Sequence, residues 1–105
     1  MNRIERLALL LALAALPAAS IQAADVTAGK AKAEEVCIDC HGDDGTGDDK
    51  TPDITPAKVS HAEFLQAMQD YRSGKRTKDA KMARAAKKLT PADVENVAAY
   101  FATLK

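Results

Sequence analysis

The sequence has few of the residues from which a small protein builds its core. Its 105 residues include no Trp, two Phe and two Tyr. Acidic and basic residues balance at 15 each, so no basic excess indicates binding to nucleic acid. The longest apolar run, residues 7–16, is too short to cross a bilayer, so we expect no integral membrane span.

The first 23 residues have the composition of a secretory signal peptide. A segment with Arg3 and Arg6 precedes the apolar run, and small residues follow it. Cleavage near Ala23 or Ala24 would leave residues 24–105 as a single exported domain.

That domain has little material for a core. Residues 24–105 contain 16 large apolar side chains, besides 15 alanines and two cysteines. A domain of roughly 80 residues rarely supplies a sufficient core by itself and usually needs a disulfide, a metal or another staple. We therefore expect an additional group inside the fold.

The hydrophobic pattern predicts an all-α domain with three helices, because no segment alternates apolar and polar residues as a strand would. The first helix covers about residues 26–40. The second begins after the N-cap Ser60, with Glu63 completing a capping box, and ends before Gly74. The third begins after the N-cap Thr90.

Charge is distributed unevenly along the domain. Six aspartates lie at the end of the first helix and in the irregular loop after it, residues 42–56, and eight basic residues follow the second helix or end it. These sets are either solvated surface or a dipolar docking surface. They are Asp39, Asp43, Asp44, Asp48, Asp49 and Asp53, and Arg72, Lys75, Arg76, Lys78, Lys81, Arg84, Lys87 and Lys88.

The only two cysteines, Cys37 and Cys40, stand directly before His41 in the pattern of c-type haem attachment. Two thiols one helical turn apart can each add to a vinyl group of the haem. The imidazole that follows can then bind the iron. The sequence therefore predicts one covalently attached haem c, with Cys37 and Cys40 forming the thioethers and His41 as an axial ligand.

Three other uses of these residues are weaker. A disulfide across two intervening residues closes a very short loop and stabilises little. A redox pair of cysteines is expected beside a βαβ pattern, which this sequence lacks. A zinc site needs four ligands, and beyond Cys37, Cys40 and His41 only His61 is an obvious candidate.

The second axial position has two methionine candidates, since methionine often completes haem ligation and raises the reduction potential. Met68 lies on the apolar face of the second helix, where methionine is ordinarily core filler. Met82 lies in a polar, Ala- and Lys-rich segment, where we expect little role in packing. Met82 is therefore the better candidate, while Met68, His61, a lysine and an open iron site remain alternatives.

Three segments of the sequence resemble small bacterial class I cytochromes c of the cytochrome c-553-like group. They are residues 37–47, 64–76 and 82–101. The resemblance implies the compact class I cytochrome c fold, with helices wrapped around one haem. It also implies ligation by Met82, because the ligating methionine of that group stands seven residues before the position of Leu89.

The resemblance implies two further contacts. Pro52 matches the proline whose backbone carbonyl orients the axial imidazole, with Pro56 as the alternative. Gly29 matches the residue at which the first and last helices cross, in contact with Tyr100 or Phe101.

Two protein ligands would leave the iron no free position for oxygen or a small substrate, which suits a carrier and not a catalyst. We therefore expect a monomeric, soluble periplasmic protein that carries single electrons between respiratory redox partners and is not an enzyme. The alternatives are a haem subunit of a larger dehydrogenase and a haem sensor or peroxidase with an open iron site.

Overall fold

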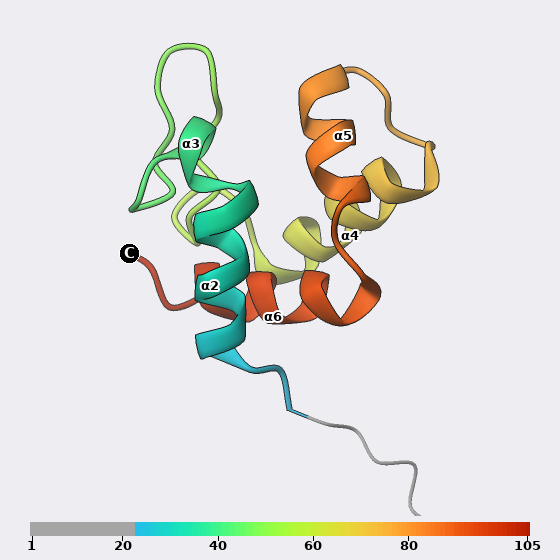
Figure 1. Ribbon diagram of the computed structural model, residues 1–105. Coiled ribbons are helices and arrows are strands. Elements are labelled where there is room, and N and C mark those ends of the chain that lie inside the picture. The colour runs from blue at the N-terminus through green and yellow to red at the C-terminus, as the bar shows by residue number, and fades with distance from the viewer. Residues whose placement is uncertain (1–22) are drawn as a thin grey trace, which may run out of the picture.

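The computed structural model describes residues 23–105, which contain five helices and no strand (Figure 1). The all-α class expected from the sequence is therefore confirmed. The expected signal peptide, residues 1–23, lies outside the described residues except for Ala23. The helices are α2 (Val26–Val36), α3 (Ile38–His41), α4 (His61–Ser73), α5 (Ala80–Lys87) and α6 (Pro91–Phe101).

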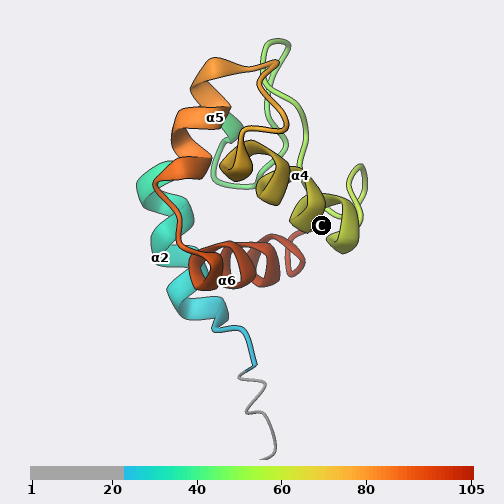
Figure 2. The same ribbon diagram turned by 90° about the vertical axis from the view of Figure 1, so that its right-hand side faces the viewer.

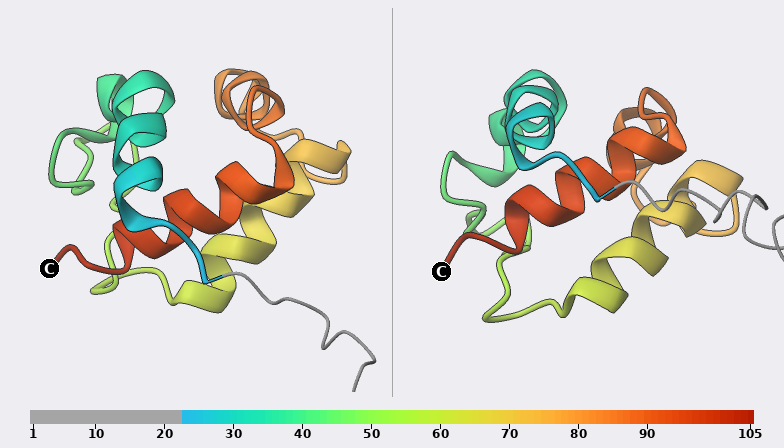
Figure 3. Two further views of the ribbon diagram at one scale, coloured as in Figure 1. Left: turned by 60° about the horizontal axis from the view of Figure 1, so that its bottom comes forward. Right: turned by 90° about the horizontal axis from the view of Figure 1, so that it is seen from below.

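Helix α6 is the base on which the other helices are arranged. It packs most extensively against α2, and α4 lies along its other side (Figure 3). Helix α4 packs against both α5 and α6 (Figure 2). As a result, α3 and α5 stand on opposite sides of the molecule, with α6 below both (Figures 1 and 3). Among residues 23–105, we find no helix with the length and apolar character needed to span a membrane.

The crossing of α2 and α6 depends on the missing side chain of Gly29. A Cβ atom at this position would overlap the carbonyl group of Asn96 and lie 3.0 Å from the backbone nitrogen of Val97. The three nearest neighbours of such a Cβ atom are thus backbone atoms of α6, about one turn before Tyr100 and Phe101. Close approach of two backbones selects glycine here.

The helix ends follow the sequence signals with one exception. The capping box of α6 is complete, since Thr90 Oγ1 accepts from Asp93 N at 3.0 Å and Asp93 Oδ2 accepts from Thr90 N at 2.9 Å. At α4, Ser60 Oγ accepts from Glu63 N at 3.1 Å. The reciprocal bond from Ser60 N to the Glu63 side chain is not made, so the capping box expected there is only half formed.

Two features of the helix pattern differ from the expectation. The expected first helix is divided at Cys37, whose φ of −109° ends α2 before α3 begins. Helix α5 was missed because its Lys- and Ala-rich sequence resembles a solvated segment. Its apolar residues Met82 and Ala86, at i and i+4, face the core, as does Leu89 just after the helix.

The core is built from one side of each long helix and is small in volume. The rings of Phe64 on α4 and Phe101 on α6 pack at its centre, with centroids 5.5 Å apart. Its buried residues are Ala33, Phe64, Met68, Ala86, Leu89, Val94, Val97, Ala98 and Phe101.

We predict that Gly29→Ala lowers the free energy of unfolding by about 1–3 kcal/mol, because the new methyl group forces α2 away from α6. At a helical position without this contact, the same replacement would stabilise the protein by about 1 kcal/mol. Equilibrium unfolding in denaturant measures the difference. An unchanged or raised stability would contradict the role assigned to this crossing.

Candidate haem site

The segment Cys37–His41 forms one tight helical turn. Cys40 N and His41 N both donate to the Cys37 carbonyl, at 3.3 and 3.1 Å, and Gly42 N donates to Ile38 O at 2.8 Å. These bonds hold the two cysteines three residues apart on one turn, with His41 at its end. That is the arrangement that two thioether bonds to one haem edge require.

The His41 imidazole is buried and oriented by a single hydrogen bond. Its side chain is 7% exposed, and Nδ1 lies 3.0 Å from the backbone carbonyl oxygen of Pro52. A carbonyl oxygen only accepts, so Nδ1 carries a proton, and in the neutral ring the free lone pair is then on Nε2. The ring is thus held in the tautomer that a metal ligand needs. In this geometry the acceptor is Pro52, not Pro56.

Gly47 allows the Pro52 carbonyl to reach this position. Its N–H donates to the His41 carbonyl at 2.8 Å, and its φ of +70° favours glycine. A Cβ atom at Gly47 would overlap the carbonyl oxygen of Thr51 and lie 2.6 Å from that of Pro52. Gly47 therefore touches the histidine turn and its acceptor together. From the sequence it is only one of several glycines in a loop, so this role was missed.

Three of the six aspartates in this region shape the loop that carries Pro52. Asp44 accepts from the Thr46 backbone and hydroxyl, and Asp48 accepts from the backbone nitrogens of Lys50 and Thr51. Asp53 accepts from Thr55 Oγ1 at 2.7 Å and from Thr55 N at 2.8 Å. Such turns are a common local use of aspartate.

These hydrogen bonds also affect titration. The bond from the Thr46 hydroxyl, followed by that from the Thr46 backbone, lowers the pKa of Asp44, and the Thr55 hydroxyl and backbone lower the pKa of Asp53 in the same way. Half of the acidic cluster thus has a structural role independent of any partner.

The two cysteines have different surroundings. Cys37 is half-buried and packs against the core, and burial raises the pKa of its thiol to about 11. Cys40 is exposed, and the two thiols are not joined as a disulfide. A thioether carries no charge in any pH range, so it suits the site of Cys37 without the cost of burying a thiolate.

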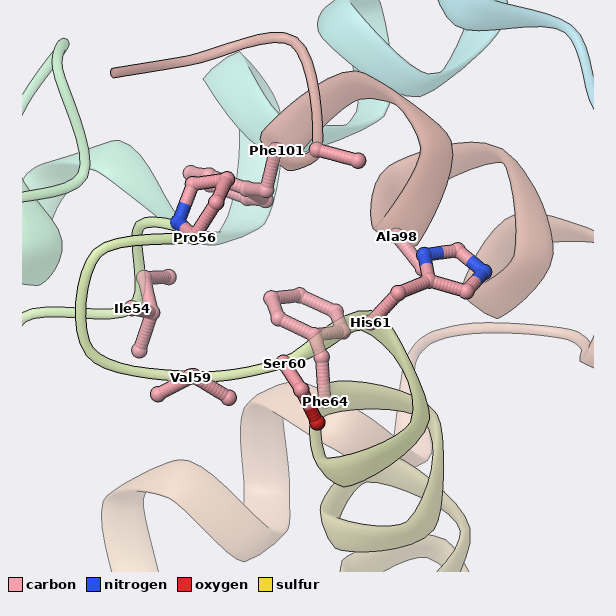
Figure 4. A pocket seen from close by; sticks show the side chains of 9 residues that line it. Ile54, Pro56, Val59, Ser60, His61, Phe64, Ala98 and Phe101 are labelled. Carbon is pink, nitrogen blue, oxygen red and sulfur yellow. The ribbon is translucent and has the colours of Figure 1, made fainter.

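The structure separates His61 from the cysteine segment. Within residues 23–105, no three His, Cys, Asp or Glu side chains come together as a metal site, and a zinc site would need such a group. His61 is exposed at the start of α4, on the edge of a pocket of about 80 Å³ beside Ala98 (Figure 4). The other pocket residues are Ile54, Pro56, Val59, Ser60, Phe64, Phe101 and Ala102.

The two methionines lie on different helices. Met68 is 5% exposed within the core on α4. Met82 is half-buried in the first turn of α5 and also packs against the core, so the expectation that it has little role in packing is wrong. Its helix stands on the side of the molecule opposite α3, which carries His41 (Figure 1).

We predict that Gly47→Ala lowers the free energy of unfolding by about 1–3 kcal/mol more than Gly74→Ala does. Both positions have positive φ, +70° and +83°, but nothing lies within 4 Å of a Cβ atom at Gly74. The control therefore measures backbone strain alone. Equilibrium unfolding of the two variants measures this difference, and the NMR shift of the His41 Nδ1 proton reports on the bond to Pro52. An equal loss of stability in the two variants would refute the role of Gly47.

Comparison with known proteins places this geometry in a family. A comparison with curated proteins gave no match. Residues 26–105, which are nearly all of the described chain, match the sequence model of the cytochrome c family. The match spans the cysteine turn, the Pro52 loop and all five helices. Members of this family carry covalently attached haem c and transfer electrons, and the donor set at Cys37, Cys40 and His41 fits that group. The chain therefore belongs to the cytochrome c family.

Proposed function

We propose that this protein is a soluble periplasmic carrier of single electrons. One haem c is attached through Cys37 and Cys40, and His41 and Met82 are the axial ligands of its iron. The observation that carries the proposal is the bond between His41 Nδ1 and Pro52 O, because it holds a buried imidazole through Nδ1 and leaves Nε2 for a metal. The signal-like residues 1–23 support export.

Each residue contributes a distinct property to the site. When bound, the haem supplies the one-electron chemistry. The Pro52 carbonyl fixes the ring orientation of His41 and increases its basicity as a ligand. The Met82 thioether, a soft ligand, favours the reduced state and so raises the potential. With both positions occupied by protein, no exchangeable site is left for a substrate.

The positions of the two methionines support Met82. Met68 is enclosed by the apolar residues of α4 and α6, where its side chain fills the core. Met82 lies in the first turn of α5, and α5 stands on the side of the molecule opposite α3, the helix that ends at His41 (Figure 1). Two axial ligands must approach the iron from opposite faces of the haem.

We predict that Met82→Ala abolishes the weak sulfur-to-iron charge-transfer band of the oxidised protein, opens the iron to carbon monoxide when reduced, and lowers the potential. Met68→Leu should leave the band intact and cost less than about 1.5 kcal/mol, as a volume-conserving core replacement. Visible spectra of the two purified variants test ligation directly. The reverse pattern would identify Met68 as the ligand of the iron.

The basic surface on and before α5 indicates the kind of redox partner. Within residues 23–105 the one salt bridge joins Lys32 and Glu35, so none of the eight basic residues forms such a pair. Two of them have roles within the fold. Arg72 Nε donates to Leu89 O at 2.8 Å, and the Arg76 guanidinium lies 5.2 Å from the centre of the Tyr71 ring.

The helix dipole accounts for some of the remaining charges but not for others. Arg84 and Lys87 lie in the last turn of α5, where cations stabilise a helix. Lys78 and Lys81 flank the start of α5, where cations are unfavourable, whereas Lys75 follows the C-terminal end of α4, where a cation is favourable. All three are exposed. The positions of Lys78 and Lys81 have no explanation in the fold, so we assign them to docking together with Lys75, which is close to them in the chain.

The partner that fits this surface is a redox protein with an acidic docking face. The three lysines flank the turn that carries Met82, so a partner bound there would lie close to that axial ligand. Of the large apolar residues in the described chain, only Val26 on α2 is exposed. A membrane-inserting surface would need such residues on α5, whose apolar side is buried against the core.

We predict that Lys75→Glu, Lys78→Glu and Lys81→Glu together slow oxidation of the reduced protein by the hexacyanoferrate(III) anion about tenfold at low salt. The effect should fade as salt screens charges beyond about 8 Å. The matched control, Lys30→Glu, Lys58→Glu and Lys105→Glu, changes net charge equally at other exposed positions. Equal slowing of both variants in stopped-flow kinetics would show that net charge alone causes the effect, and would contradict docking at these three lysines.

A further inference from the structure

Asp79 holds the backbone at the start of α5. Its Oδ1 accepts from Lys81 N and from Met82 N, both at 3.0 Å. Asp79 is the N-cap, with extended backbone, and Met82 is the third residue of the helix. The amide of the proposed iron ligand is thus bound directly by this carboxylate.

No neighbouring residue can take over this role. Helix α5 has only eight residues and no acidic residue in its first turn. Between residues 71 and 92, Asp79 is the only acidic residue among eight basic ones. So short a helix is not stable alone, and α5 packs chiefly against α4. Its first turn, which carries Met82, therefore depends on the cap.

The two ends of α5 are held in different ways. At the C-terminal end, Arg72 from α4 binds the carbonyl of Leu89, just after the helix. At the N-terminal end, the hydrogen bonds that Asp79 accepts come only from the next residues of the same helix. The segment before Asp79 turns through Gly74 at φ +83°. Opening of the Asp79 cap would release the first turn while the other end stays attached.

We propose that Asp79 is a positioning residue that keeps Met82 in place for the haem iron. The inference rests on the proposed ligation by Met82. Without the cap, the amides of Lys81 and Met82 lose their acceptor, the first turn frays, and the methionine sulfur is displaced more readily. The hydrogen bond acts through geometry, so asparagine, an equally good cap, should replace aspartate.

The test measures binding of imidazole to the oxidised, haem-loaded protein, because imidazole must displace the methionine. Asp79→Ala should raise the imidazole affinity about fivefold, which is about 1 kcal/mol at 1.4 kcal/mol per tenfold. Asp79→Asn should stay within twofold of the natural protein. Amide exchange at Met82 should quicken in the alanine variant alone.

Asp25→Ala is the matched control. Asp25 is the N-cap of α2 and accepts from Ala28 N at 3.0 Å, so its loss removes a comparable cap far from Met82 along the chain. It should lower overall stability by a similar amount and leave imidazole affinity unchanged. Equal imidazole affinity in the two alanine variants would overturn the proposal.

Two further results separate the possible failures. If Asp79→Asn behaves as Asp79→Ala, the negative charge and not the cap matters, and the positioning role is refuted. If the charge-transfer band survives in Met82→Ala, the ligation itself is wrong and the proposed axial pair fails before Asp79 is considered. If that band is lost but Asp79→Ala resembles the natural protein, ligation stands and only the positioning role fails.

Discussion

The hydrogen bond from His41 to the Pro52 carbonyl is the constraint around which the site is organised. It requires the loop after α3 to fold back on the histidine turn, and the aspartate turns at Asp44, Asp48 and Asp53 give the loop that path. Gly47 lets the two halves of the loop meet without a side chain between them. A ligand used in electron transfer must keep its geometry in both oxidation states, and the hydrogen bond from His41 to a carbonyl on a well-ordered loop meets that demand.

The sequence predicts the parts of this protein whose signals are local. The cysteine spacing, the cap at Thr90 and the all-α class depend on residues within a few positions of one another. The roles of Gly29 and Gly47 depend on contacts with the backbone of α6 and of the Pro52 loop. Neither contact can be predicted from the presence of a glycine in the sequence. Helix α5 could not be predicted because the only large apolar residue within it is Met82, and basic residues and alanines surround that methionine in the sequence.

Both charged regions stand out as clusters in the sequence, but the reasons for their charges differ. On the acidic side, half of the carboxylates accept hydrogen bonds from backbone amides two or three residues further along the chain, so local folding already accounts for them. On the basic side, Lys78 and Lys81 at the start of α5 have no salt-bridge partner and oppose the helix dipole. A charge that the fold does not use is a better indicator of a binding surface than a charge cluster as such.

The bond from Asp25 N to Asn96 Oδ1, 2.8 Å long, joins the start of α2 to α6. Asp25 directly follows the expected cleavage positions, Ala23 and Ala24. Cleavage after Ala24 would turn the Asp25 amide into a terminal ammonium, still able to donate to Asn96 but unfavourable at the positive end of α2. Cleavage after Ala23 would keep a neutral amide there. If the chain is cleaved at one of these positions, the choice between them would set the charge beside Asn96, where the first and last helices meet.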